Sequence, residues 1–289
     1  MRFAHLATDA GPRLALAADG GYVRLDDMLP DAPSTLDELL ADPDLWLASI
    51  AAADHAGHVR AEARLAAPFA APRSVIAIGL NYHDHCREFG TPPPESPIVF
   101  VKLPTSVVGP AADVRWDTAV TSEVDWEAEL GVVIGREARN VEPGTATQFI
   151  FGYTAINDLT ARDVQRAEQQ WVRAKSLDTF CPMGPVVVTR DELDPAAGLG
   201  IRSWVNGTQM QDSSTAEMIF GVDELVSYLS RSFTLRPGDV IATGTPLGVG
   251  AFRTPPVFLA DGDVVEVEIE GIGRLRNQCR VTNSEGALG

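Results

Sequence analysis

The sequence predicts an α+β protein that consists mainly of β-strands and carries a small α/β unit at its N-terminus. Short runs of β-branched residues recur after Arg73, and turn residues separate most of them. The runs lie too close together for helical crossovers, which excludes an alternating βαβ fold. The predicted strands are Val75–Ile78, Ile98–Val101, Leu130–Ile134, Val186–Thr189, Ile201–Val205, Val240–Ala242 and Val264–Ile269. The predicted helices of this region are Tyr82–Phe89, Leu159–Gln169 and Val222–Ser230.

The N-terminal segment has the pattern of a separate small domain. Asp19-Gly20-Gly21 stands between two apolar stretches and predicts a hairpin turn. Ser34 or Thr35 is then a candidate N-cap for a helix that runs towards Ala53. A stretch rich in Ala and Pro follows and is typical of a linker. The boundaries that we expect are 1–66 for the N-terminal domain, 67–73 for the linker, 74–283 for the larger domain and 284–289 for a C-terminal tail.

Composition and charge exclude several classes of function. The formal net charge of −17 repels phosphate backbones, and the chain has no Lys/Arg run, so we expect no nucleic-acid partner. No apolar run approaches the length of a membrane span, and we expect no membrane partner. The three cysteines are scattered and form no Cys-x-x-Cys pair, which favours a reducing, cytoplasmic location.

The segment from Asp125 to Ile134 carries two acidic side chains in a predicted strand. Because side chains alternate along a strand, Glu127 and Glu129 are expected on the same face. Two carboxylates this close repel each other unless a cation lies between them. One interpretation is therefore a metal site, and the other is a solvated edge strand with two surface acids.

A third acid follows the next apolar strand. Asp158 lies where that strand ends and a helix is expected to begin, so it is either an ordinary helix N-cap or a third oxygen ligand. Three carboxylates suit Mg²⁺, Mn²⁺ or Ca²⁺ rather than Zn²⁺ or Cu²⁺, and they leave positions for water and substrate. Arg162 and Gln165 are expected on the same side of the helix, facing the pocket or solvent.

Three further segments carry candidate catalytic or binding groups. His85 and Glu88 lie three residues apart in a short helix that Gly90 ends, so they form either a water-activating pair or a surface salt bridge. Lys175 precedes a Pro-bounded loop and is either a surface charge or a cation that stabilises an oxyanion. The Gly-rich segment around Thr245 is either a flexible turn or a cradle for a substrate carboxylate.

Taken together in this order, residues 74 to about 281 resemble the fumarylacetoacetate hydrolase superfamily. The N-terminal unit is similar to the small variable domain of many bacterial members. One position departs from the pattern, because some acylpyruvate-cleaving members have Arg where this chain has Leu80. The matching motifs are Ile78-Gly79-Leu80-Asn81-Tyr82, Asp125-Trp126-Glu127-Ala128-Glu129-Leu130, Ile156-Asn157-Asp158-Leu159-Thr160-Ala161-Arg162-Asp163, Lys175 through Pro185, and Gly244-Thr245-Pro246-Leu247-Gly248-Val249-Gly250.

The resemblance implies a mixed β-sandwich roll and a homodimer. It implies that Mg²⁺ or Mn²⁺ is bound by Glu127, Glu129 and Asp158. It implies a catalytic His–Glu pair, which falls on His85 and Glu88. It further suggests substrate contacts by Arg162, Gln165, Lys175, Thr245 and Lys102.

The activity that we expect from this resemblance is metal-dependent hydrolysis of a C–C bond in a 2,4-dioxo acid, of the acylpyruvate or 2,4-diketo-3-deoxy sugar acid type. His85, oriented by Glu88, would activate water, and the metal and Lys175 would stabilise the enolate that leaves. The same site would serve an oxaloacetate decarboxylase or a 2-hydroxyhepta-2,4-diene-1,7-dioate-type isomerase. A non-enzymatic binding protein stabilised by a metal is the remaining alternative.

Overall fold

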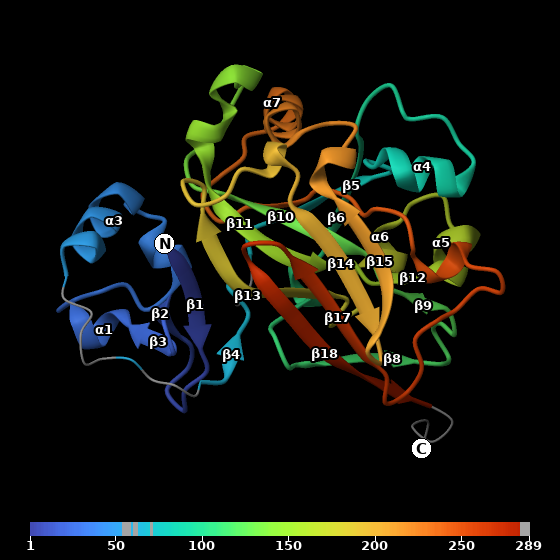
Figure 1. Ribbon diagram of the computed structural model, residues 1–289, viewed down its shortest axis with the longest axis horizontal. Helices are drawn as coiled ribbons and strands as arrows, with labels where there is room; N and C mark the ends of the chain where they lie inside the picture. The colour runs from blue at the N-terminus through green and yellow to red at the C-terminus, as the bar shows by residue number, and fades with distance from the viewer. Residues whose placement is uncertain (54–58, 60–62, 70–71, 284–289) are drawn as a thin grey trace.

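The computed structural model describes residues 1–283 apart from 54–58, 60–62 and 70–71 (Figure 1). The expected tail at 284–289 and part of the expected linker at 67–73 lie outside the described residues. None of the described helices is long and apolar enough to cross a membrane.

A large sheet forms one layer of the molecule. Its main path runs β3-β2-β1-β13-β11-β10-β16-β5-β6, with β4 paired to β1 and β7 paired to β13. The strands β10 and β11 lie near its centre and are buried on both faces. Its strands are β1 (Arg2–Leu6), β2 (Arg13–Ala18), β3 (Gly21–Arg24), β4 (Leu65–Ala66), β5 (Val75–Gly79), β6 (Ile98–Lys102), β7 (Val107–Val108), β10 (Ala128–Ile134), β11 (Ile150–Asn157), β13 (Cys181–Thr189) and β16 (Val240–Ala242).

A second sheet packs against the first and completes a mixed β-sandwich (Figure 1). The core between the two sheets contains Leu130, Val132, Ile201, Val267 and Ile269. Both sheets are mixed, because β5 pairs in parallel with β16 and β8 pairs in parallel with β18. The second sheet has the order β15 (Thr208–Ser214), β14 (Gly200–Val205), β17 (Val264–Ile269), β18 (Gly273–Thr282), β8 (Asp113–Asp117), and a two-stranded sheet joins β9 (Val124–Asp125) to β12 (Thr160–Ala161).

The N-terminal strands continue the large sheet, because β1 pairs with β13 through Arg2↔Val188 and Phe3↔Val187. The predicted hairpin turn is confirmed between β2 and β3. The helices are α1 (Leu25–Met28), α2 (Leu36–Leu39), α3 (Pro43–Ala52), α4 (His83–Phe89), α5 (Arg162–Ala167), α6 (Val172–Lys175) and α7 (Val222–Ser232), and short 3-10 turns occupy Pro104–Ser106, Pro143–Phe149, Pro195–Ala197, Thr215–Glu217 and Gly250–Phe252.

The seven predicted strands are all confirmed, and two helix predictions need correction. The helix expected from Ser34 or Thr35 to Ala53 is split, because Thr35 caps α2 while Asp42 caps a new helix that begins at Pro43. The helix expected over Leu159–Gln169 begins only at Arg162, because β12 pairs with β9 first. Helices α4 and α7 match their predictions closely.

Close approach of β11 to β13 at Gly152 gives a test of the sheet. A Cβ added at Gly152 would lie 2.1 Å from the Val188 carbonyl oxygen, so Gly152→Ala must separate two core strands. We expect a loss of about 1–3 kcal/mol or more in the free energy of unfolding, measured by urea titration. Gly144→Ala is the control, because a Cβ added at Gly144 would have no atom of the described residues within 4 Å, its chain neighbours apart. We expect its free energy of unfolding to change by less than about 0.5 kcal/mol. Equal stability of the two variants would contradict the described register.

Candidate active site and metal centre

Three carboxylates converge at the end of the β10–β11 pair. One carboxylate oxygen each from Glu127, Glu129 and Asp158 lies within 4.8 Å of the other two. Glu129 lies on β10 and is 1% exposed, while Asp158 follows β11 and is 0% exposed. The antiparallel register Ala128↔Asn157 places these two strand ends side by side, which brings acids that are far apart in sequence into one cluster.

The strand that carries Glu127 is interrupted, which differs from the single strand that the sequence predicts. Strand β9 ends at Asp125 and β10 begins at Ala128. The backbone of Glu127 is held instead by its neighbours across the sheet: its N–H donates to Asn157 Oδ1 at 3.0 Å, and its carbonyl accepts the Asp158 N–H at 2.9 Å. Glu127 and Asp158 are therefore joined by one backbone hydrogen bond, and the Asn157 side chain holds Glu127 beside it.

Two cations lie against the triad. Lys175 Nζ donates to Glu127 Oε2 at 2.7 Å and to Asp158 Oδ2 at 2.9 Å. Lys102, which is 1% exposed, donates to Asp158 Oδ1 and to the Lys175 carbonyl. Lys102 is absent from the described lining of the pocket, and its ammonium contacts Asp158. The expected contact of Lys102 with substrate stays a prediction.

The two glutamates have opposite pKa shifts. Burial raises the pKa of Glu127, but the charges of Lys175 and Arg162 outweigh it and lower the pKa to about 2. Burial, together with the carboxylates of Asp158 and Glu127, raises the pKa of Glu129 well above its usual range. Among the described side chains, none donates a hydrogen bond to Glu129, which accepts the Gly244 N–H at 2.9 Å. Three buried carboxylates, one of which has no cationic hydrogen-bond partner among the described residues, provide oxygen ligands that fit a hard divalent cation.

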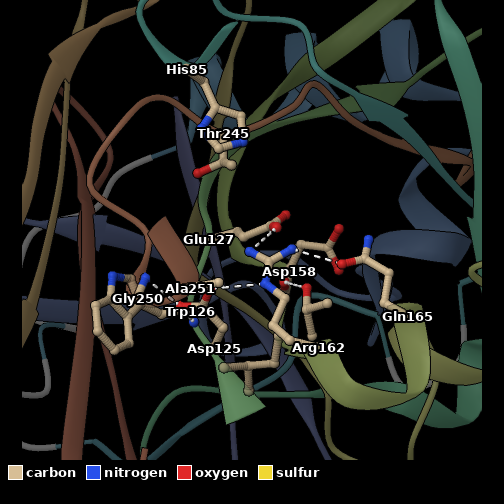
Figure 2. Close-up of polar contacts among 12 residues, drawn as sticks. His85, Asp125, Trp126, Glu127, Asp158, Arg162, Gln165, Thr245, Gly250 and Ala251 are labelled. Atoms are coloured by element: carbon tan, nitrogen blue, oxygen red, sulfur yellow. Dashed lines mark hydrogen bonds and ion pairs between the residues drawn. The ribbon is translucent and has the colours of Figure 1, made fainter. Parts of the chain in front are cut away.

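The guanidinium group of Arg162 donates hydrogen bonds to three side chains of the protein (Figure 2). Its Nε donates to Asp125 at 2.8 Å, one terminal nitrogen donates to Glu127 at 2.7 Å, and the other donates to Gln165 at 3.0 Å. Asp125 is fully buried and also accepts N–H groups from Gly250 and Ala251. Arg162 therefore lines the pocket mainly as the support of Glu127, while Gln165 lines it at the expected place.

The histidine–glutamate pair forms as expected on helix α4. His85 Nδ1 lies 3.0 Å from Glu88 Oε2, and Glu88 Oε1 accepts the Gly248 N–H at 2.9 Å. Because a carboxylate only accepts hydrogen bonds, Nδ1 is the donor and Nε2 remains free to accept a proton. Gly90 ends the helix in the left-handed conformation, as predicted. His85 lines the same pocket as Glu127 and Glu129.

Most of the candidate site residues line one cavity of about 420 Å³, while Glu88, Asp158 and Lys102 are outside its described lining. Thr245 is 4% exposed, and its hydroxyl accepts a hydrogen bond from Gln211 Nε2 at 2.8 Å. The polar lining consists of His85, Glu127, Glu129, Arg162, Gln165, Arg166, Lys175 and Thr245, and the remainder is Ile78, Gly79, Leu80, Phe89, Phe100, Trp171, Ala251 and Phe252.

Sequence reasoning missed the residues that hold the site in place. Asp125 precedes Glu127 by two residues, so the alternation that paired the glutamates was also a signal for Asp125. Gln211 accepts the Ala128 N–H at 3.0 Å and reaches Thr245, and Asn157 holds Glu127. Neither amide side chain has a local sequence pattern that distinguishes it from a surface residue.

The mixed β-sandwich, with a buried acidic triad that could hold a metal ion beside a histidine–glutamate pair, is the arrangement of one class of enzyme. Residues 74–280 match the family model described as "Fumarylacetoacetate (FAA) hydrolase C-terminal", and the chain belongs to this family.

Similar proteins cover nearly the whole chain. "Oxaloacetate tautomerase fahd2, mitochondrial" of Xenopus laevis is 42% identical over 273 residues, which span 92% of this chain and 85% of that protein. The solved "Fumarylacetoacetate hydrolase (EaFAH)" of Exiguobacterium antarcticum is 38% identical with a TM-score of 0.86, covering 98% of this chain and 100% of that one. The "2-hydroxyhepta-2,4-diene-1,7-dioate isomerase" of Mycobacterium marinum is 34% identical with a TM-score of 0.76, covering 99% and 100%. Membership of the family is thus shown, while the names of the relatives include tautomerases and isomerases beside a hydrolase.

The triad predicts one Mn²⁺ site per chain, measurable by the loss of the free-ion electron paramagnetic resonance signal. We expect Asp158→Asn to weaken Mn²⁺ binding more than about 100-fold, because changes even behind a ligand cost about 10–100-fold. Glu142→Gln removes an exposed carboxylate elsewhere and should leave the binding curve unchanged. Equal affinity in both variants would contradict the metal site.

Proposed function

We propose that this chain catalyses the keto–enol tautomerisation of a 2-oxo acid, with oxaloacetate as the substrate to test first. The observation that carries the proposal is one cavity lined by His85, Glu127 and Glu129. Asp158 completes the acidic triad, and Glu88 lies 3.0 Å from the ring of His85. An oxygen-rich metal site suits the carboxylate and 2-oxo oxygen of such an acid, and a histidine beside it suits proton removal from the adjacent carbon. The names of relatives that are about 40% identical support the same reaction.

In this proposal Glu127, Glu129 and Asp158 hold Mg²⁺ or Mn²⁺, which when bound polarises the carbonyl of a 2-oxo acid. His85 Nε2 accepts a proton from C3 of the substrate, and Glu88 stabilises the imidazolium that results. The proton then returns to the 2-oxo oxygen, which gives the enol with no net gain or loss of atoms.

Lys175 acts as a cation rather than as a base. Burial lowers its pKa, but the carboxylates of Asp158 and Glu127 outweigh burial and raise the pKa above its ordinary value. The ammonium therefore stays charged at neutral pH and can stabilise an oxygen on which negative charge develops. Gln165 and Thr245 are proposed to contact the substrate carboxylate.

Hydrolysis of a C–C bond in a 2,4-dioxo acid is the second candidate, because the ordered His85–Glu88 pair is equally suited to activating water. An assay with acetylpyruvate distinguishes the two reactions: hydrolysis releases acetate and pyruvate, whereas tautomerisation releases neither. The same product analysis on oxaloacetate registers decarboxylation as pyruvate.

Two sequence-based expectations remain proposals, a cytoplasmic location and a homodimer. The three cysteines are buried and free, as suits a reducing compartment. Strand β6 is at the edge of the large sheet and exposes Val99 and Val101, and the exposed Leu103 follows it directly, which suits an interface between two copies. Light scattering of the purified protein tests the dimer.

Replacement of the proposed base gives the sharpest test. His85→Ala should lower kcat for oxaloacetate tautomerisation by about a hundred- to ten-thousandfold, while Mn²⁺ binding is retained. The rate is measured as the loss of absorbance when the enol converts to the keto form. His83→Ala is the matched control, because His83 lies on the same helix and is exposed. A fully active His85→Ala protein would remove this residue from the mechanism.

A further inference from the structure

The cavity has a polar floor and an apolar wall. The polar part of the lining, which we call the floor, includes Glu127, Glu129, His85 and Lys175, and the oxo-acid head of a substrate would bind there. The remaining lining is apolar and largely aromatic, which no step of the proton transfer requires. Two of its rings adjoin the floor, because the ring centroid of Phe252 lies 5.6 Å from that of His85 and the ring centroid of Phe100 lies 5.2 Å from Lys175 Nζ. The wall consists of Ile78, Leu80, Phe89, Phe100, Trp171 and Phe252.

Two aromatic pairs form most of this wall. Phe89 on helix α4 meets Phe252 edge to face, with ring centroids 4.9 Å apart and an interplanar angle of 88°. Phe100 on β6 meets Trp171 at 5.3 Å and 72°. Trp171 packs so closely on Gly79 that an added Cβ there would lie 2.6 Å from its ring. Each pair leaves ring surface open to the cavity, and a further ring can pack on it edge to face.

Phe89 is the least buried member of the wall. Its side chain is 50% exposed, so the core of the protein gains little from it. It is placed by the last turn of a helix whose other end carries His85, and both side chains line the cavity. A large exposed ring at the mouth of a cavity is typical of a contact surface for a ligand.

The charges of the lining disfavour a second carboxylate on the substrate. The cationic side chains of the described lining are Arg162, Lys175 and Arg166, apart from the histidine. Each already has a carboxylate partner: Arg162 has Glu127, Lys175 has Glu127, and Arg166 has Glu123. A carboxylate at the far end of a bound acid would lie against aromatic rings without a free counter-charge, which is costly.

The volume of the cavity points the same way. Cavities of about 300–1,000 Å³ accept drug-sized ligands. The cavity here is about 420 Å³, which leaves space beyond a four-carbon oxo acid bound at the floor. Building on the proposed tautomerisation, we infer that this site prefers 2-oxo acids whose far end is an apolar ring, and that Phe89 is a specificity-determining residue for that ring.

Paired substrates test the preference. With Mg²⁺-loaded protein, kcat/KM for tautomerisation is measured for phenylpyruvate, which carries a ring, and for oxaloacetate, which carries a carboxylate. We expect phenylpyruvate to be favoured at least about tenfold, the lower end of what apolar contacts give. Phe89→Ala should lower this ratio about tenfold. Phe233→Ala removes a comparably exposed phenylalanine outside the cavity and should leave the ratio unchanged.

A binding measurement separates this inference from the proposed reaction. Calorimetry compares phenylglyoxylate, which cannot enolise, with pyruvate, which has a methyl group in place of the ring. We expect phenylglyoxylate to bind at least about tenfold more tightly, and Phe89→Ala to remove the difference. Tighter ring binding without turnover of any 2-oxo acid would sink the tautomerase proposal and retain the inference. Turnover of oxaloacetate with no preference for a ring, in rate or in binding, would overturn the inference alone.

Discussion

Burial of three carboxylates at one point is the constraint on which the rest of the site depends. Glu127, Glu129 and Asp158 are at most 5% exposed. Buried carboxylates this close raise each other's pKa wherever no cation balances their charge. The protein compensates unequally, with Lys175 and Lys102 beside Asp158 but only a backbone N–H at Glu129. A divalent cation would balance the remaining negative charge at Glu129. The same ion would therefore stabilise the buried cluster and take part in the chemistry of the site.

A second layer of contacts makes this arrangement rigid. Asp125 binds Arg162, and Arg162 binds Glu127, so the orientation of one metal-site carboxylate depends on an acid that does not touch the cluster. Asp125 also accepts the N–H groups of Gly250 and Ala251, which fixes the loop that carries Phe252 into the pocket. Contacts of this kind fix the orientation of metal ligands, and their removal lowers the affinity for the metal. The same carboxylate thus supports both the polar floor and the apolar wall.

Local patterns were sufficient to predict the parts of the site that are close in sequence. Alternation placed Glu127 with Glu129, and helical spacing placed His85 with Glu88, because both depend on the geometry of a single element. The break at Trp126–Glu127 was not predictable, since it depends on two hydrogen bonds across the sheet. Glu127 N–H donates to Asn157 Oδ1, and the Glu127 carbonyl accepts the Asp158 N–H.

The contacts of Lys102 and Arg162 with buried acids could not be predicted for a related reason. A cation near a candidate site has no sequence pattern that tells a ligand contact from a contact with a buried acid. Only the packing of β6 behind Asp158 places Lys102 out of the cavity, and only the interior position of Asp125 occupies Arg162. Each of the seven β-branched runs predicted a strand of the structure, because burial determines such runs, whereas long-range polar pairing does not leave such a pattern.

Helix α4 connects the chemistry to the recognition of the substrate. It is anchored by Asp84, which accepts the Ser213 hydroxyl at 2.5 Å, and by Glu88, which accepts the Gly248 N–H. Between these anchors it carries His85, and at its end it carries Phe89. A substrate tail that packs on Phe89 would therefore contact the same short helix that positions the proton acceptor His85. Contacts remote from the reacting carbon can in this way stabilise the arrangement in which the proton is transferred, which is how binding energy raises a rate rather than only an affinity.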